Sequence, residues 1–235
     1  MVQVIAHRGA SGYAPENTRS AFDLAIEMGA DAIETDVQLT RDGRLVLIHD
    51  DRVDRTTNGL GPVADYTLAE LQALDAGDWF DPVFAGQRVM TLDELFSEYG
   101  RRIPFCLELK DPLATAPFLD WLHATDMPED LQVTSFSWSA VLAVRDALPS
   151  ITTGFLSKVF DPDIMERCDR RGFTQICPPA KLLETELVER AHAFGLVVRA
   201  WGVAERADAD RVVETGADGA TVNWPDWLVA PPDHI

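Results

Sequence analysis

The sequence predicts an α/β fold of the (β/α)8 TIM-barrel class, and three observations lead to this prediction. Short apolar runs alternate with segments of helical pattern, which is typical of parallel β/α architecture. Eight such runs occur within 235 residues, and eight is the number that closes this barrel. The runs are unbroken and rich in β-branched residues or Leu, as expected of strands buried on both faces. The main alternative, an open doubly wound sheet, would more often carry about five or six strands and a glycine fingerprint that is absent here.

The elements follow one another in regular order. The eight runs cover residues 4–6, 32–37, 105–109, 132–136, 152–156, 175–177, 196–201 and 219–222. Helical patterns between them include residues 20–28, 91–96 and 183–194. Glycines follow several helical segments where a left-handed helix cap is expected, at Gly29, Gly100, Gly172, Gly195 and Gly216.

One spacing in the series is anomalous. Successive strands begin 20–28 residues apart, but the second and third begin 73 residues apart. We therefore expect a single domain, residues 1–235, with an insertion at approximately 38–90. The insertion contains the hairpin signal Asp42-Gly43, and we expect it to form a small cap over one end of the barrel.

Composition excludes several classes of protein. The chain has 39 acidic and 20 basic residues, a formal net charge of −19, which argues against nucleic acid or an anionic membrane as a partner. No run of about 18 apolar residues predicts a transmembrane helix, and no signal peptide is visible at the N-terminus. The three cysteines show no CxxC pairing, which favours a reducing compartment, so we expect a cytoplasmic protein. The oligomeric state is left open.

Charged residues gather at the expected carboxyl ends of the first three strands, where barrel enzymes place their sites. Glu34 and Asp36 are two residues apart on one strand and therefore project to the same side. Glu108 on the next strand adds a third carboxylate. Oxygen ligands without sulfur or clustered imidazoles select a hard cation, so the pattern predicts one divalent ion, Mg²⁺ or Ca²⁺, with Mn²⁺ as an alternative.

Two histidines and two cations approach the same end of the barrel. His7 ends the first strand and His49 follows the hairpin, and histidine is the natural proton carrier near neutral pH. Arg8 and Lys110 add positive charge beside the predicted metal. Together these groups indicate an anion site, and phosphate is the anion that they favour.

These residues lie in motifs that resemble the glycerophosphodiester phosphodiesterase family. The motifs are His7-Arg8-Gly9, Pro15-Glu16-Asn17-Thr18, Glu34-Thr35-Asp36-Val37, His49-Asp50 and Glu108-Leu109-Lys110. Later segments, residues 133–136, 198–201 and 216–219, fit as well. The resemblance implies a TIM barrel with an insertion after the second strand. It also implies hydrolysis of small-molecule glycerophosphodiesters to glycerol 3-phosphate and an alcohol.

The resemblance also implies a role for individual residues. The metal ligands would be Glu34, Asp36 and Glu108, and the acid–base pair His7 and His49. Arg8 and Lys110 would hold the phosphate, while Phe136 and Trp201 would line the glycerol or leaving-group side. Glu16 and Asn17 would brace the site. Two departures from the family pattern, Gly202 and Asn223, are expected to lie away from these groups.

Other functions stay open at this point. A lysophospholipase D-like phosphodiesterase would need an apolar channel or membrane-facing patch, which the short insertion and the acidic chain disfavour. A non-catalytic phosphodiester-binding protein on the same fold would be expected to lack one of the histidines or ligands, and none is missing. A metal-dependent barrel lyase or aldolase would not explain two histidines flanked by Arg8 and Lys110. The sequence does not choose the headgroup, the first base, or between a cyclic phosphate and direct attack by water.

Overall fold

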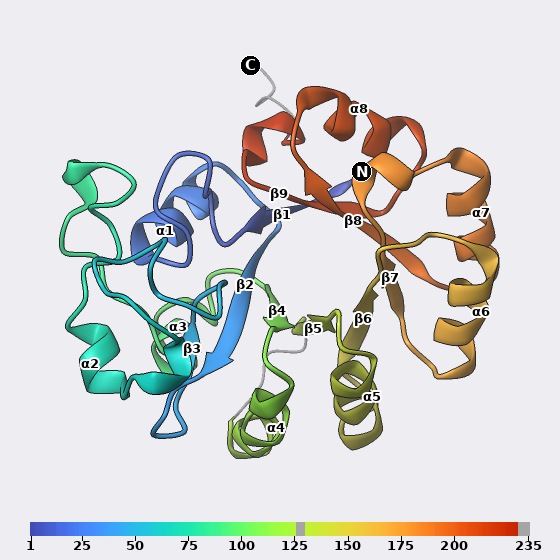
Figure 1. The fold of residues 1–235 in the computed structure, drawn as a ribbon. Coiled ribbons are helices and arrows are strands. Elements are labelled where there is room, and N and C mark those ends of the chain that lie inside the picture. The colour runs from blue at the N-terminus through green and yellow to red at the C-terminus, as the bar shows by residue number, and fades with distance from the viewer. Residues whose placement is uncertain (126–129, 230–235) are drawn as a thin grey trace.

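The computed structural model describes residues 1–125 and 130–229. In this part of the chain nine strands form one sheet, and eight of them are parallel and close into a barrel because β1 pairs with both β9 and β2. Figure 1 shows these strands around the centre with the helices outside them. The strands are β1 (Gln3–His7), β2 (Ala32–Leu39), β3 (Leu45–Leu47), β4 (Phe105–Leu109), β5 (Gln132–Ser135), β6 (Thr152–Leu156), β7 (Gln175–Cys177), β8 (Val197–Val203) and β9 (Gly219–Val222). The predicted (β/α)8 barrel is confirmed.

The helices begin at residues that can satisfy their free amide groups. The side chain of Thr18 accepts a hydrogen bond from the Ala21 N–H at the start of α1, and Thr91 and Glu94 form a reciprocal capping box on α3. No helix in residues 1–125 and 130–229 is long and apolar enough to cross a membrane. The helices are α1 (Arg19–Glu27), α2 (Leu68–Gln72), α3 (Leu92–Tyr99), α4 (Thr115–Ala124), α5 (Trp138–Ala147), α6 (Pro162–Arg170), α7 (Thr185–Ala193) and α8 (Arg206–Glu214).

The predicted left-handed glycines form at four of the five positions. Gly29, Gly172, Gly195 and Gly216 all have positive φ. The prediction is wrong for Gly100, whose φ is −59°. The amides of both residues 102 and 103 donate to the carbonyl of residue 99, so the chain continues in a right-handed turn after α3 and needs no left-handed residue.

The insertion is joined to the barrel through β2, which changes partner along its length. Its first residues pair with β1, and Val37–Leu39 pair antiparallel with β3 on the same edge. β2 ends at Leu39, one residue beyond the predicted start of the insertion at 38. Gly43, with φ +74°, turns the hairpin between them as predicted. In Figure 1 the insertion lies beside α1 and α3. It has an apolar cluster of its own, built on Val46, Ile48, Val53, Val63, Leu71, Ala76 and Val89.

On the early strands β1, β2 and β4, the inside of the barrel is apolar at one end and polar at the other. Ile5, Ala32 and Cys106 form a small buried cluster inside the early strands. The larger apolar clusters lie between the barrel and its helices, with Phe22, Phe105 and Phe118 among the fully buried side chains. The next residues along the same inward-facing rows are His7, Glu34 and Glu108. The polar side chains are therefore held on a rigid, closed sheet.

We expect Gly9→Ala to lower the free energy of unfolding by about 2–4 kcal/mol. The added Cβ would lie 2.6 Å from the backbone carbonyl of Ala21, and φ at Gly9 is +83°. Gly195→Ala is the matched control, because φ is +74° but nothing lies within 4 Å of the added Cβ. Gly195→Ala should lower the free energy of unfolding only by the cost of a positive φ in alanine, about 1 kcal/mol. Urea denaturation measures both, and equal losses would contradict the close packing at Gly9.

Candidate active site

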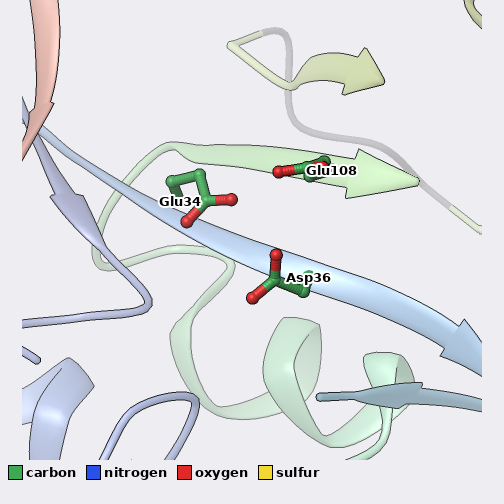
Figure 2. A group of neighbouring side chains, drawn as sticks. All are labelled: Glu34, Asp36 and Glu108. Carbon is green, nitrogen blue, oxygen red and sulfur yellow. The ribbon is translucent and has the colours of Figure 1, made fainter. Parts of the chain in front are cut away.

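Three buried carboxylates meet inside the barrel at the carboxyl ends of β2 and β4 (Figure 2). Glu34 and Asp36 are two residues apart on β2 and therefore share one face, and the strand register places Asp36 opposite Glu108. One carboxylate oxygen from each residue lies within 4.8 Å of the others, and the residues are only 3%, 0% and 7% exposed. The structure therefore brings together all three residues that the sequence pattern assigned to a metal.

The three carboxylates differ in how their charge is compensated. Burial and the neighbouring charges of Asp36 and Glu108 raise the pKa of Glu34 well above its usual value. Burial and the charge of Asp36 raise the pKa of Glu108. Burial also opposes ionisation of Asp36, but Arg8 and Lys110 outweigh it, and the pKa of Asp36 is lowered. The neighbouring cations of the protein thus compensate the charge of Asp36 but leave the charges of Glu34 and Glu108 incompletely compensated.

The donor set of the cluster fits a divalent cation. All its donors are carboxylate oxygens, which hard cations prefer. Oδ1 of Asp36 is buried and accepts no hydrogen bond from any described residue, although the Nζ of Lys110 lies 3.4 Å from it. A cation bound by Glu34, Asp36 and Glu108 would use this oxygen and offset the repulsion within the cluster.

Arg8 and Lys110 flank the carboxylates. The Nε of Arg8 lies 3.1 Å from Oδ2 of Asp36, and the Nζ of Lys110 lies 2.8 Å from Glu108 and 3.4 Å from Asp36. Arg8 reaches this position from the end of β1 with φ +57°, an uncommon conformation for a residue with a side chain. Both cations also line the pocket described below, so they face a ligand as well as the carboxylates.

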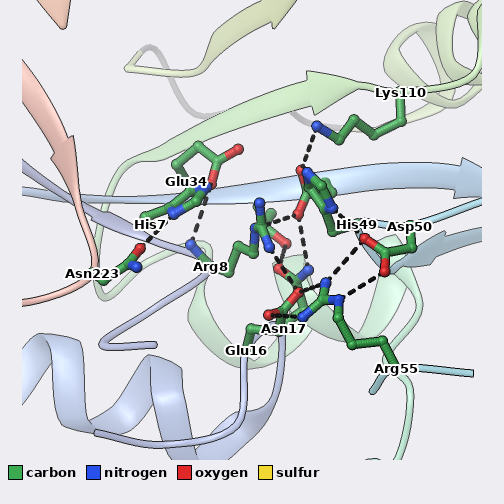
Figure 3. A network of polar contacts seen from close by, with 12 residues as sticks. His7, Arg8, Glu16, Asn17, Glu34, His49, Asp50, Arg55, Lys110 and Asn223 are labelled. Atoms are coloured by element: carbon green, nitrogen blue, oxygen red, sulfur yellow. Dashed lines mark hydrogen bonds and ion pairs between the residues drawn. The ribbon is translucent and has the colours of Figure 1, made fainter. Parts of the chain in front are cut away.

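The two histidines approach the cluster with different partners (Figure 3). The Nδ1 of His7 lies 2.6 Å from the amide oxygen of Asn223, and its Nε2 lies 3.9 Å from Glu34. The Nδ1 of His49 lies 2.6 Å from the carboxylate of Asp50. His49 reaches the site because the Ile48 N–H, just before it, donates to the carbonyl of Asp36.

The contact of Asn223 with His7 corrects one expectation. The sequence suggested that Asn223 lies away from the site, but it directly holds one histidine. The second departure, Gly202, lines the pocket, so it too lies at the site. Gly202 lies on β8, and Asn223 directly follows β9, the strand that barrel closure brings next to β1.

A chain of alternating charges joins the two sides of the site. Arg8 pairs with Glu16 at 2.9 Å, and Arg55 from the insertion pairs with Glu16 and with Asp50, both at 2.7 Å. Figure 3 shows Arg55 between the two acids. Asp50 in turn holds His49, so the chain extends from the carboxylate cluster to the insertion's histidine.

Asn17 braces the cluster from the loop after β1. Its Nδ2 donates to Oδ2 of Asp36 at 3.0 Å, and its Oδ1 accepts from Thr35 Oγ1 at 2.7 Å. Its backbone is also left-handed, with φ +57°. Asn tolerates this conformation better than most residues do. With Glu16 in the charge chain, both residues of the Glu16-Asn17 pair lie where a bracing role requires.

One pocket of about 270 Å³ opens over these groups. The rings of Phe136 and Trp201 lie 5.3 Å apart, edge to face, on its wall. The pocket brings together every predicted site residue except Asp36, which lies buried behind it. Its lining residues are His7, Arg8, Glu34, His49, Glu108, Lys110, Thr134, Phe136, Leu156, Arg199, Trp201, Gly202 and Thr221.

Sequence reasoning missed Arg55 and Arg199. Arg55 lies in the insertion, where no strand pattern places its side chain. Arg199 lies on a strand, two residues before Trp201, and this spacing of two could have assigned both to the barrel interior.

The chain is similar to known proteins of one family. The sequence model described as the glycerophosphoryl diester phosphodiesterase family matches residues 7–227. A glycerophosphodiester phosphodiesterase of Caldanaerobacter subterraneus subsp. tengcongensis is 37% identical, over 96% of this chain and 96% of its own.

Solved structures are similar as well. A phosphodiesterase of Oleispira antarctica in complex with the product sn-glycerol-3-phosphate superposes with a TM-score of 0.87 at 31% identity, covering 96% of this chain and 94% of its own. The glycerophosphodiester phosphodiesterase of Agrobacterium tumefaciens gives 0.81 at 31% identity, covering 97% and 99%.

We expect a divalent cation to stabilise the protein through the carboxylate cluster. At about a hundredfold excess over its dissociation constant the gain is about 2.7 kcal/mol. Glu34→Gln should lose most of this gain. In the presence of a chelator, however, it should unfold at a higher temperature than the wild type, because one of three repelling buried carboxylates is gone. Asp78→Asn, an exposed acid on the insertion, is the control. Thermal denaturation with and without Mg²⁺, Ca²⁺ or Mn²⁺ measures each effect. If the cation raised the unfolding temperature of the wild type and of both variants equally, the cation would bind elsewhere.

We expect Arg55→Met to lower the free energy of unfolding by about 1–2 kcal/mol at neutral pH. The hydrogen bond from Arg55 lowers the pKa of Asp50, and Arg55 with Arg8 outweighs burial to lower that of Glu16. Carboxyl groups with a lowered folded-state pKa stabilise the fold above their unfolded pKa, and this stabilisation is lost as the pH falls through the folded pKa. The difference between wild type and variant should therefore shrink from pH 7 to about pH 3.

The matched control is Arg52→Met, which removes an exposed pair with Asp54 in the same insertion. It should destabilise less. Urea denaturation across the pH range is the measurement, and a difference that grows on acidification would contradict the charge chain.

Proposed function

The chain belongs to the glycerophosphoryl diester phosphodiesterase family, and from this premise we propose that it hydrolyses glycerophosphodiesters to sn-glycerol 3-phosphate and an alcohol. The observation that carries the proposal is the pocket in which two imidazoles, two flanking cations and the carboxylates of Glu34 and Glu108 converge, with Asp36 directly behind them. The structural neighbour from Oleispira antarctica, which holds sn-glycerol-3-phosphate, supports this substrate class.

The cations and the carboxylates suit a phosphodiester. Arg8 and Lys110 would bind the phosphoryl oxygens, Arg8 through its planar guanidinium and Lys110 as a point charge. Glu34, Asp36 and Glu108 would hold one divalent cation, Mg²⁺, Ca²⁺ or Mn²⁺. When bound, such an ion supplies positive charge for the phosphoryl group and for the attacking oxygen. Phe136 and Trp201 would line the pocket beside the substrate's organic groups.

The partners of the histidines support a division of their roles. The amide oxygen of Asn223 accepts a hydrogen bond from the Nδ1–H of His7. The Nε2 of the neutral imidazole therefore carries the lone pair, and it faces the carboxylates. We assign His7 as the base that takes the proton of the attacking hydroxyl. Asp50 beside His49 stabilises an imidazolium, so His49 would give its proton to the leaving alcohol.

These roles balance the reaction. The attacking oxygen forms a bond to phosphorus as the bond to the leaving oxygen breaks. His7 takes the proton of the attacking hydroxyl, and His49 gives a proton to the leaving alcohol. Arg55 and Glu16 would act only by positioning Asp50 and Arg8. Where the attacking hydroxyl belongs to the glycerol, water opens the cyclic phosphate with the histidine roles reversed.

We expect His7→Ala and His49→Ala each to lower kcat on glycerophosphocholine by roughly 10²–10⁴ with the fold intact. The two variants should differ on glycerophospho-p-nitrophenol, whose leaving group needs no proton. There His49→Ala should lose about tenfold or less, while His7→Ala keeps its full loss.

The measurement is steady-state kinetics with circular dichroism as the check on folding, and His192→Ala, an exposed histidine on α7, is the control. Near-normal turnover in either active-site variant would remove that histidine from the mechanism. A wild-type enzyme that releases no glycerol 3-phosphate from any glycerophosphodiester, with any of the three cations, would overturn the proposed function.

A further inference from the structure

Arg199 is a buried cation that the mechanism above does not use. It lies on β8, is 2% exposed and lines the pocket. Nη1 donates to Oγ1 of Thr221, and Nη2 lies 3.5 Å from Sγ of Cys177. Its Nε has no hydrogen-bond partner among the described residues, and no carboxylate of the described chain forms an ion pair with it within 4.0 Å.

Such a side chain is unfavourable unless something else compensates it. Arginine stays charged in proteins, and a buried charge without an ionic partner or a full set of hydrogen bonds destabilises the fold. A hydroxyl and a thiol satisfy only part of the five N–H donors of Arg199. Free donors on a buried guanidinium that borders a pocket indicate a ligand with oxygen acceptors.

Arg199 lies at the closed end of the pocket. The residues around this end are buried: Thr134 is 0% exposed, Leu156 4% and Thr221 5%. Phe136, 39% exposed, marks the open end. In a glycerophosphodiester the glycerol is constant in size and carries free hydroxyls, whereas the esterified alcohol varies. The constant part suits the closed end, and the variable part needs the opening.

We propose that Arg199 donates hydrogen bonds to the glycerol hydroxyl oxygens of the substrate, and so selects glycerol phosphodiesters over phosphodiesters without glycerol. This inference rests on the proposed function. Thr221 holds Nη1 of the guanidinium, which fixes its plane, and Nη1 and Nη2 each carry a second N–H that can donate to an oxygen acceptor.

A binding experiment tests the contact directly. Arg199→Met should weaken the binding of sn-glycerol 3-phosphate, measured by calorimetry with divalent cation present, by about tenfold or more. The binding of inorganic phosphate should change less than about twofold, because the phosphate contacts of Arg8 and Lys110 are intact. Equal losses for both ligands, or no loss for glycerol 3-phosphate, would overturn the proposal.

Kinetics separate the glycerol from the leaving alcohol. Arg199→Met should lower kcat/KM for glycerophosphocholine, glycerophosphoethanolamine and glycerophosphoglycerol by the same factor, about tenfold or more. For bis(p-nitrophenyl) phosphate, which has no glycerol, the change should stay below about twofold. Unequal factors among the three glycerophosphodiesters would overturn the assignment to glycerol in favour of the alcohol.

Stability distinguishes a binding role from a structural one. Removing an uncompensated buried charge should leave the Tm of Arg199→Met equal to or above that of the wild type, whereas loss of a structural residue would lower it. Arg145→Met is the matched control: it removes an arginine whose Nε donates to the Gly172 carbonyl away from the pocket, and it should keep wild-type discrimination.

Two further variants keep the test decisive if Arg199→Met does not fold. Arg199→Lys keeps the charge but has fewer donors. Thr221→Val removes the hydroxyl that accepts from Nη1, so the plane of the guanidinium is no longer fixed. Each should show a smaller loss of the same glycerol-dependent kind, and a loss shared with bis(p-nitrophenyl) phosphate would overturn the proposal. A wild-type enzyme inactive on all glycerophosphodiesters would contradict the proposed function instead.

Discussion

The negative charge buried at the end of β2 is the constraint on which the rest of the site depends. Asp36 is fully buried and keeps its charge because Arg8 and Lys110 lie against it. Arg8 in turn is held by Glu16, and each further charge along the chain to His49 has a partner of opposite sign. This alternation makes the insertion a part of the active site although it contributes a single residue, His49, to the pocket lining.

The barrel supplies the rigidity that this arrangement needs. β2 pairs with β1 at its start and with β3 at its end, so one strand carries Glu34 and Asp36 and also sets the position of the hairpin. The hydrogen bond from Ile48 to the Asp36 carbonyl then returns the chain to the carboxylates. The relative positions of the metal ligands and the second histidine thus follow from strand pairing, which is stiffer than a loop.

Local patterns explain which features the sequence could predict. The spacing of two between Glu34 and Asp36 and the carboxyl-end rule of barrels predicted the convergence of the carboxylates, and Asp42-Gly43 predicted the hairpin. Contacts between distant segments gave no such signal. Asn223 meets His7 only because β9 closes the barrel on β1, 216 residues along the chain. Arg55 depends on how the insertion folds, and the turn after Gly100 depends on two amides that share one carbonyl.

The residues that react and the residues that line the walls of the pocket come from different parts of the chain. The imidazoles, the three carboxylates and the two cations beside them lie before residue 111, and the walls of the pocket, with Arg199, come from residues 134–221. Asn223 crosses this division to hold His7. Changes confined to the later strands can therefore reshape what fits while the reacting groups stay untouched. A duplicated gene of this kind could acquire a new substrate range by altering only its second half.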